Sequence, residues 1–371
     1  PIIGYQGEEL STRAFSEKSE HFFFVEQTIL TGGKLKKSRR IFEHEQTEAA
    51  AEKETQKQRV LNSVRMLYYE TLAADERVEL RKQLSRLADE AVKISEELFN
   101  IGQADRPDLL EAEVEAQQTE LALIEAENER ENVWQMMASV VGNPALKPAR
   151  LAGNLESDIP SLDREAMLAA LIAASPEIKS ARVRVERARA VIDRARAERA
   201  PDIFLRGGFG YSREILEGTG RATGPEGFIE AGIRIPLFNR NQGNIAAAQA
   251  DLSIAERDVQ RLELSLRARF SQVFAEYSSS LRAVERFQQR ILPRAEKAYE
   301  LYLTSFRQMA AAYPQVLIAQ RTMFQVREEY IVALARLHQN AIRLQGFLLT
   351  GGLSAPAMRG IEAQGAGDTD R

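Results

Sequence analysis

The amino-acid sequence predicts a mixed, mainly helical fold with long coiled-coil hairpins and four β-strands. One stretch, residues 34–100, contains neither proline nor glycine, and four other stretches alternate apolar with polar residues. A short turn sequence also occurs twice, 207 residues apart, each time after a long helical stretch. We therefore interpret the chain as an internal twofold repeat in which each half has two strands, a long helix, a tight turn and a return helix.

Two long helices are predicted, at 34–100 and at 244–306, and the first would be roughly 100 Å long at about 1.5 Å per residue. It is rich in strong helix formers, and its apolar residues step by four and three, the spacing of a coiled-coil seam: Leu80, Leu84, Leu87, Ala91, Ile94 and Leu98. The second helix keeps this spacing from Leu281 to Ala298, and Pro293 is expected to kink it. Shorter helices are expected at 107–141, 176–200 and 314–349.

The clearest strand is predicted at 228–238, where apolar residues occupy one face with a period of two: Ile229, Ala231, Ile233, Ile235 and Leu237. A second strand is predicted at 203–211, and a glycine-rich polar loop, 212–227, joins the two. The N-terminal counterparts are 1–10 and 21–30, with a polar loop between them. In 21–30 the alternation is poorer, because the row that starts at Phe22 and Phe24 continues with Glu26.

These elements define the expected domains. Residues 1–150 form the first repeat, 151–175 a linker, 176–353 the second repeat and 354–371 a disordered tail. At the 207-residue offset Pro1 matches Gly208, which already lies inside a strand. We therefore expect a processed or truncated N-terminus, with the counterpart of helix 176–200 upstream of Pro1.

Composition excludes several classes of function. The chain has no cysteine, three histidines far apart in sequence and a net charge of −4, so we expect no metal site, no cofactor and no nucleic-acid partner. No phosphate-binding loop or nucleophile motif is present, and we expect no enzyme activity. No apolar run reaches the roughly 18 to 20 residues of a spanning helix.

Four strands cannot close a barrel, and an open sheet leaves both edges and one apolar face uncovered. If the apolar rows face lipid, closure is required, because unpaired backbone groups are not tolerated in a bilayer. Three copies would give a trimeric transmembrane β-barrel of twelve strands with a lumen of glycine and polar side chains. The long helices would then lie side by side as an α-barrel.

Three segments together resemble the TolC family of outer membrane efflux proteins. They are the strand-to-helix corner "IRIPLFNRNQGNIAAAQADLSIAE" (233–256), the two turns "FNIGQADRPDLLEAE" (99–113) and "FRQMAAAYPQVLIAQ" (306–320), and the helix "SPEIKSARVRVERARAVIDRARAERAPDI" (175–203). In this order and spacing they extend the resemblance over residues 1–353.

The resemblance implies a homotrimer in the outer membrane of a Gram-negative bacterium, with a helical tunnel through the periplasm. It implies the exit duct of a tripartite pump, with a periplasmic adaptor (membrane fusion) protein, an inner-membrane transporter of the resistance-nodulation-division type and outer membrane lipid as partners. The helix before the second strand pair and the ending "VGNP" (141–144) are most similar to the branch that serves heavy-metal pumps, and drugs or other small organic molecules are the alternative cargo.

In this family the hairpin turns form the periplasmic tip that closes the tunnel and meets the adaptor. The resemblance assigns this role to eight residues: Phe99, Gly102, Asp105, Asp108, Leu110, Phe306, Pro314 and Leu317. Asp105, Asp108 and Glu111 are candidate constriction acids, which a trimer would repeat three times. Alternatively, Asp108 is an acid favoured by the dipole of a helix N-terminus. The second turn departs from the pattern, with Met309 where glycine is usual and with Ala312, Gln315 and Ile318 in place of the acids.

Two other interpretations use the same features. Long helices with heptads are typical of soluble coiled-coil scaffolds, which would leave residues 203–237 dispensable. A trimeric adhesin-type surface protein would also be bound to the membrane, but without a pump. The strand pairs, repeated at nearly the same offset, favour the export duct.

Overall fold

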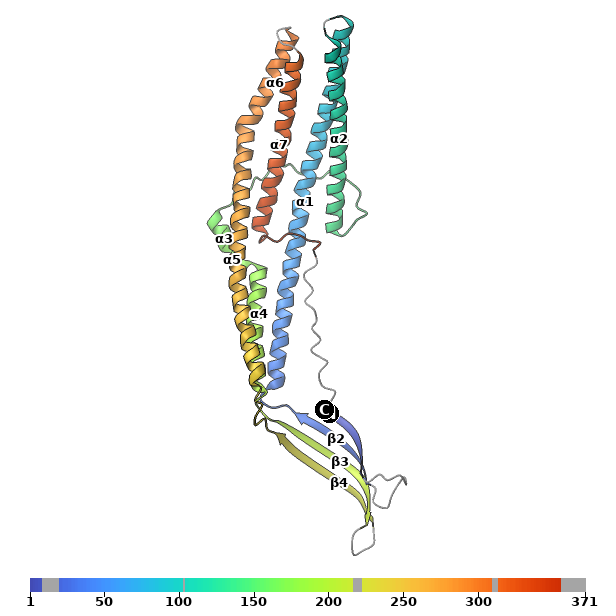
Figure 1. Cartoon of the computed structure of the whole chain (residues 1–371), viewed down its shortest axis with the longest axis vertical. Helices are drawn as coiled ribbons and strands as arrows, with labels where there is room; N and C mark the ends of the chain where they lie inside the picture. The colour runs from blue at the N-terminus through green and yellow to red at the C-terminus, as the bar shows by residue number, and fades with distance from the viewer. Residues whose placement is uncertain (9–19, 103, 216–221, 309–312, 355–371) are drawn as a thin grey trace. The chain divides into compact units, whose positions relative to one another are not determined.

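The computed structural model describes residues 1–8, 20–102, 104–215, 222–308 and 313–354. Its elements follow the chain in the order β1 (Ile2–Glu8), β2 (Glu20–Ile29), α1 (Lys34–Asn100), α2 (Arg106–Val141), α3 (Arg164–Ala174), α4 (Pro176–Ala197), β3 (Asp202–Ile215), β4 (Ala222–Arg234), α5 (Gln242–Arg286), the π-helical turn η1 (Phe287–Ile291), α6 (Leu292–Arg307) and α7 (Tyr313–Gln345) (Figure 1). The predicted mainly helical fold with four strands is confirmed. None of the described helices combines the length and apolar composition needed to cross a bilayer.

The chain divides into two compact units. The sheet unit contains residues 1–51 and 177–261, and the hairpin unit contains residues 52–176 and the chain from 262 onward. Helices α1 and α5 contribute residues to both units. Each unit takes residues from both halves of the sequence, so this spatial division differs from the division into repeats.

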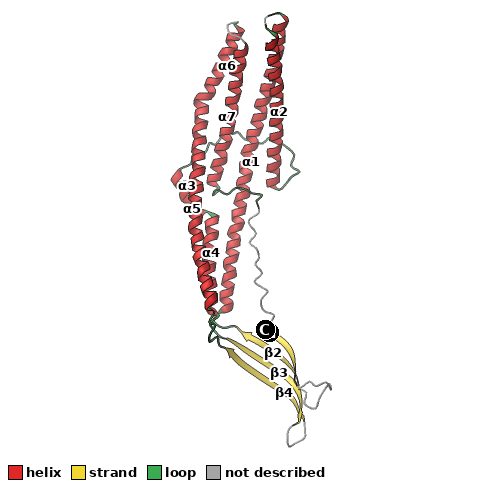
Figure 2. Ribbon diagram, viewed as in Figure 1, coloured by secondary structure: helices red, strands yellow, loops and turns green. Residues whose placement is uncertain are grey.

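In the sheet unit, the four strands form one antiparallel sheet in the order β1-β2-β3-β4. Figure 2 shows the strands as one yellow sheet. Within the described residues β1 and β4 each pair on one side only, so they are the two edges of the sheet.

Helix α4 is tied to the start of α1 and of α5 by ion pairs. Arg184 pairs with Glu48 on α1 at 2.6 Å, and Arg187 with Glu45 at 2.5 Å. On the other side, Arg189 contacts a carboxylate of α5, that of Glu256, at 3.4 Å. The three helix segments therefore form a charged bundle at one end of the sheet.

The strand prediction at 228–238 was wrong at both ends. Strand β4 starts at Ala222 and ends at Arg234, so Ile235 and Leu237 lie beyond it. It ends there because its last pair is Asp202–Arg234, and the nearby prolines Pro201 and Pro236 have no N–H to donate to a ladder.

The predicted loop 212–227 was also too long. Strand β3 continues to Ile215 through a register shift after Ser212, and β4 begins at Ala222. Residues 216–221 lie outside the described residues, as do residues 9–19 of the polar loop predicted between the first two strands. The predicted tail also lies there, except for Ser354.

The helix predictions hold with small changes. Helix α1 has the predicted bounds. The helix predicted at 244–306 is interrupted by η1, and Pro293 lies at the start of α6, where a missing N–H costs little. Helix α4 ends at Ala197 and α7 at Gln345, a few residues earlier than predicted.

A segment of the hairpin unit, residues 146–162, crosses four helices, and we call it the strap. Four aromatic side chains, one each from α2, α1, α7 and α5, donate hydrogen bonds to its main-chain carbonyls: Trp134 to Leu146 (2.9 Å), Tyr68 to Ala152 (2.5 Å), His338 to Leu155 (2.7 Å) and Tyr277 to Pro160 (2.5 Å). Because Leu155 is fully buried, the strap is part of the core. The strap covers the first part of the predicted linker, 151–175. Helix α3 (Arg164–Ala174), which was not predicted from the sequence, occupies most of the remainder.

The strap gives a pH prediction at Glu76. Burial, and secondly the charge of Glu156 on the strap, raise the pKa of the Glu76 carboxyl above its ordinary value. A raised folded-state pKa means that the ionised carboxylate destabilises the fold, and this cost disappears as pH falls toward the unfolded-state pKa. We expect Glu76→Gln to raise the thermal midpoint, followed by helical circular dichroism in detergent, at pH 7.5.

The advantage of Glu76→Gln over the wild type should shrink at pH 5. His338, whose pKa burial lowers, is present in both proteins and cancels from the difference. Glu79→Gln, at an exposed site on the same helix, is the matched control. An advantage that does not change with pH would contradict this account of Glu76.

Candidate functional site

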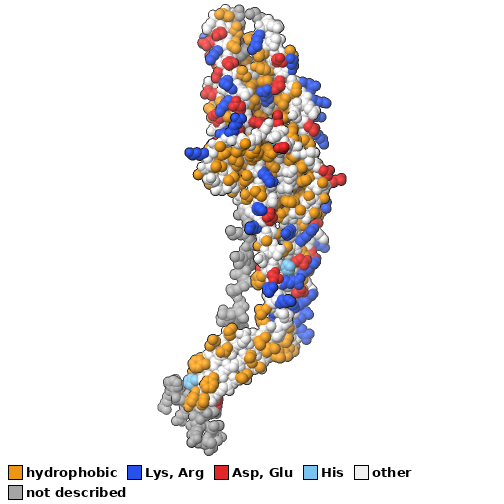
Figure 3. Space-filling view, turned by 180° about the vertical axis from the view of Figure 1, so that it is seen from behind, with side chains coloured by type: hydrophobic (Ala, Val, Ile, Leu, Met, Phe, Trp, Pro, Cys, Tyr) orange, Lys and Arg blue, Asp and Glu red, His pale blue; other side chains and the backbone are white. Residues whose placement is uncertain are grey.

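One face of the sheet is apolar and, among the described residues, not covered by another element, and we call it the apolar face. Cross-strand neighbours share a face, so the register brings together Ile3, Tyr5, Phe23, Val25, Ile29, Ile203, Leu205, Phe209, Tyr211, Ile229, Ala231 and Ile233. The side chain of Ile229 is 86% exposed and that of Phe23 is 68% exposed. In the view of Figure 3 the sheet shows hydrophobic side chains with hardly any charged ones, whereas charges spread over the helices.

The apolar row of β2 differs from the row examined in the sequence. Phe23, Val25 and Ile29 share the apolar face, whereas Phe22, Phe24 and Glu26 lie on the other side, which we call the glycine face. Pairing of Phe23 with Phe209 and of Phe24 with Gly208 decides this. Three consecutive phenylalanines, 22 to 24, do not by themselves reveal which row is apolar.

Aromatic residues gather on the apolar face near the strand ends that lie away from the helices. Tyr5 and Phe23 have ring centroids 5.4 Å apart, and Tyr5 also stacks on and hydrogen-bonds to His21. Phe209 and Tyr211 on β3 stand opposite Phe23 and His21. Aromatic rows of this kind are typical of the boundary between the apolar band of a membrane barrel and water.

A buried lysine fixes the other end of the sheet to the helices. Lys34, the first residue of α1, is 3% exposed, and its Nζ lies 2.6 Å from Asp202 on β3 and 3.3 Å from Glu198 after α4. Burial acts to raise the pKa of Glu198, but hydrogen bonds from Arg194 and Lys34 lower it overall. The backbone N–H of Thr31 donates to the second oxygen of Asp202 at 2.9 Å. One cation thus joins a strand and two helices.

The first predicted tip turn closes the α1–α2 hairpin as expected. Gly102 has a φ of +75°, a conformation that favours glycine, and its N–H donates to the Phe99 carbonyl at 3.0 Å. Asp105 is the N-cap residue of α2, without a side-chain capping bond, and Asp108 lies in the first turn. The side chain of Leu110 is 50% exposed.

The three candidate acids, Asp105, Asp108 and Glu111, are all exposed, and within the described chain none forms an ion pair. The side chain of Asp105 makes no capping hydrogen bond, and the dipole of α2 favours an acid at Asp108. All three carboxylates are available to solvent at the turn.

The second turn is described in part. Phe306, near the end of α6, is half-buried, and Pro314, at the start of α7, is exposed. Leu317 is buried, whereas Ile318 is 62% exposed. Met309 and Ala312 lie outside the described residues. Both turns occur at the same end of the hairpin unit (Figure 1).

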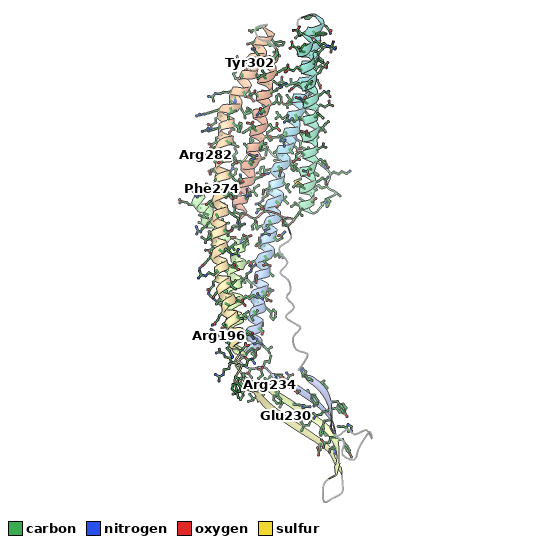
Figure 4. The ribbon with its side chains drawn as sticks, viewed as in Figure 1. Arg196, Glu230, Arg234, Phe274, Arg282 and Tyr302 are labelled. Carbon is green, nitrogen blue, oxygen red and sulfur yellow. The ribbon has the colours of Figure 1, made fainter. Side chains whose placement is uncertain are left out.

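Ion pairs connect the two hairpins around a cavity of 270 Å³ between α1, α2 and α7. Arg321 on α7 pairs with Glu115 on α2, and Glu328 accepts from Arg77 at 3.2 Å and also from Arg81. Tyr302, labelled in Figure 4, is exposed on α6, below the second turn. In the described part of the chain no three histidine, aspartate or glutamate side chains are grouped to hold a metal ion.

The sequence did not reveal Lys34, Arg206 or the aromatic row as functional. Lys34 begins a helix rich in lysine, and nothing local marks it as buried. The aromatic row and the neighbours of Arg206 depend on pairing between strands that are about 180 residues apart in the chain. Alternation indicated strands but could not supply their register.

Known proteins share this fold. VceC of Vibrio cholerae, an outer membrane protein, superposes with a TM-score of 0.73 over 95% of this chain and 86% of its own, at 17% identity. The curated relatives include the cobalt-zinc-cadmium resistance protein CzcC of Cupriavidus metallidurans, 27% identical over 76% of this chain, and the pyoverdine export outer membrane protein OpmQ of Pseudomonas putida, 24% identical over 75%. The chain spans 65% and 59% of the length of these two relatives.

The model of the outer membrane efflux protein family matches residues 4–143 and 167–349. These ranges include most of β1, the other three strands, both hairpins and the corner between β4 and α5 that carried the resemblance in the sequence. The chain therefore belongs to the outer membrane efflux protein family.

Proposed function

We propose that this protein is the exit duct of a tripartite efflux system in the outer membrane of a Gram-negative bacterium. Within the described residues the sheet has an exposed apolar face and two unpaired edges, and this observation supports the proposal most directly. In a bilayer these edges require partners, and three copies supply a closed barrel of twelve strands. The apolar face, including Ile229, Ala231 and Ile233, then contacts outer membrane lipid.

The partners follow from the same proposal. The tip residues of both turns meet a periplasmic adaptor, and an inner-membrane transporter of the resistance-nodulation-division type supplies the energy. The exposed apolar side chains of Phe99 and Leu110 suit contact with another helical protein.

Metal ions are the cargo that we favour, because the relative CzcC is a cobalt-zinc-cadmium resistance protein. OpmQ, a pyoverdine export protein, supports small organic molecules as the second candidate. Deletion of the gene should raise cellular cobalt, zinc or cadmium, measured by mass spectrometry, and the intact gene should reverse this. Unchanged metal content with impaired export of an organic compound would favour the second candidate, and no change in either would contradict the duct.

The acids of the first turn give a separate prediction. We propose that Asp105, Asp108 and Glu111 line the periplasmic mouth and attract cations. The triple variant Asp105→Asn, Asp108→Asn, Glu111→Gln should lower cation over anion permeability in planar bilayers several-fold. Glu113→Gln with Glu120→Gln and Glu125→Gln, exposed acids farther along α2, is the matched control. An equal loss of cation selectivity in both triple variants would show that the three acids of the turn affect permeability no more than other exposed acids of α2.

A further inference from the structure

The glycine face of the sheet is a flat aromatic wall. Four phenylalanines each stand directly opposite a glycine on a neighbouring strand: Gly4 with Phe24, Gly210 with Phe22, Gly208 with Phe228 and Gly232 with Phe204. A Cβ at any of these glycines would come within 2.5 Å of the ring. The rings therefore lie over the glycines.

Several cross-strand pairs on this face carry charge, among them Glu8–Glu20, Gly210–Glu226 and Asp202–Arg234, and one row in the middle of the sheet carries three charges. Arg206 on β3 stands directly opposite Glu26 on β2 and Glu230 on β4 (Glu230 is labelled in Figure 4). The row carries two carboxylates and one guanidinium, a net charge of −1 in each chain. It adjoins a cavity of 670 Å³ on the same face, room for roughly twenty waters at ~30 Å³ each.

The guanidinium of Arg206 contacts two aromatic rings and Gln6. Its guanidinium carbon lies 3.8 Å from the ring centroid of Phe24 and 5.6 Å from that of Phe228, and Nη2 donates to Gln6 Oε1 at 2.5 Å. Among the described residues neither Glu26 nor Glu230 forms an ion pair with it. Stacking on an aromatic face holds a guanidinium without cancelling its charge. The two carboxylates therefore remain free for a passing ion.

We propose that the row Glu26–Arg206–Glu230 is a charge filter of the barrel lumen that favours cationic cargo. In this filter the two carboxylates attract cations, and the positive charge of the stacked Arg206 reduces this attraction. This inference rests on the proposed function, because it requires the glycine face to line water. Three chains would place six carboxylates and three guanidinium groups around one level of the lumen, where fixed charges select ions.

The absence of cysteine allows a direct test with a single reporter thiol. Thr28, exposed on the glycine face and lining the same cavity, is changed to cysteine. Its reaction rates with a cationic and an anionic methanethiosulfonate are measured in outer membranes. A unit charge about 8 Å away changes each rate about twofold in opposite directions, so the ratio of the two rates changes about fourfold.

In the Thr28→Cys background, Arg206→Gln should raise the ratio of cationic to anionic rate about fourfold. Glu26→Gln with Glu230→Gln should lower it by more than that, and Arg206→Lys, which keeps the charge, should leave it unchanged. Arg257→Gln, an exposed position on α5, is the control for a distant charge. The amount of trimer is checked for every variant. If Arg206→Gln fails to fold, the Glu26→Gln, Glu230→Gln variant and the Arg206→Lys variant test the charge filter.

The two possible failures are distinguishable. If the Thr28 thiol does not react with either reagent, or an Ile229→Cys thiol on the apolar face reacts as fast, the glycine face does not line water and the proposed duct is contradicted. If Thr28→Cys reacts and Ile229→Cys is protected, but neither the arginine nor the glutamate variants move the ratio, the charge filter is overturned while the duct stands.

Discussion

Ile229→Arg is expected to prevent stable insertion of the protein into the outer membrane. Ile229 is 86% exposed and lies in the middle of five cross-strand rows of the apolar face. An arginine on the lipid-facing side of a membrane barrel costs about 2–4 kcal/mol near the bilayer midplane. Three copies would repeat that cost three times in one barrel. The measurement is the amount of trimer in purified outer membranes, with the non-inserted protein recovered from the soluble fraction.

Two control variants separate lipid contact from other effects. Glu230→Arg places the same side chain one residue away on the glycine face and should insert normally. Ile229→Ala removes the isoleucine without adding charge and should also insert. Normal insertion of Ile229→Arg would show that the apolar face does not contact lipid.

Lys34→Met is expected to cause the largest loss of stability in the sheet unit. The change leaves Asp202 and Glu198 as carboxylates around an apolar side chain, where Nζ had lain within 3.3 Å of both. Breaking a fully buried ion pair costs about 3–5 kcal/mol. The side chains of Asp202 and Glu198 are 24% and 39% exposed in the folded protein. We therefore expect a smaller loss of unfolding free energy, about 2–4 kcal/mol. Unfolding in denaturant, followed by circular dichroism in detergent, measures the change.

Removing the orphaned charge of Asp202 should restore most of this loss. The double variant Lys34→Met, Asp202→Asn keeps the shape of the site and removes the carboxylate that loses its cation, whereas Glu198 keeps its ion pair with Arg194. Lys36→Met, at an exposed position two residues along α1, is the control and should change little. A loss for Lys34→Met no larger than that of Lys36→Met would contradict a structural role for the ion pairs.

Local patterns predicted the helices well and the sheet less completely. Helix α1 needs no tertiary information, because strong helix formers continue without a breaker until Gly102. The start of β4 could not be predicted, since "ATGPEG" (222–227) has the composition of a turn and becomes strand only through pairing with β3. Helix α3 did have a local signal, because the side chain of Asp163 accepts the N–H of Ala166 as an N-cap.

In the candidate site, too, local features could be predicted from the sequence and contacts between strands could not. The existence of the first turn could be predicted, because Gly102 with its positive φ and Pro107 at the start of α2 are local signals, whereas the role of its residues as a periplasmic tip stays a prediction. The charged row of the glycine face was not, because Arg206 meets Phe24 and Glu26 only once two distant strand pairs are in register. Side-chain partners across a sheet are a property of register, which period-two alternation does not define.

Three copies of this chain are expected to close a barrel in the outer membrane. The most direct measurement is the mass of the detergent-extracted protein by native mass spectrometry, after purification from outer membranes without heating. We expect the mass of three copies of the chain, and the 371 residues of this sequence contribute 41.6 kDa to each copy. A single copy, or a protein that remains in the aqueous fraction without detergent, would contradict the account.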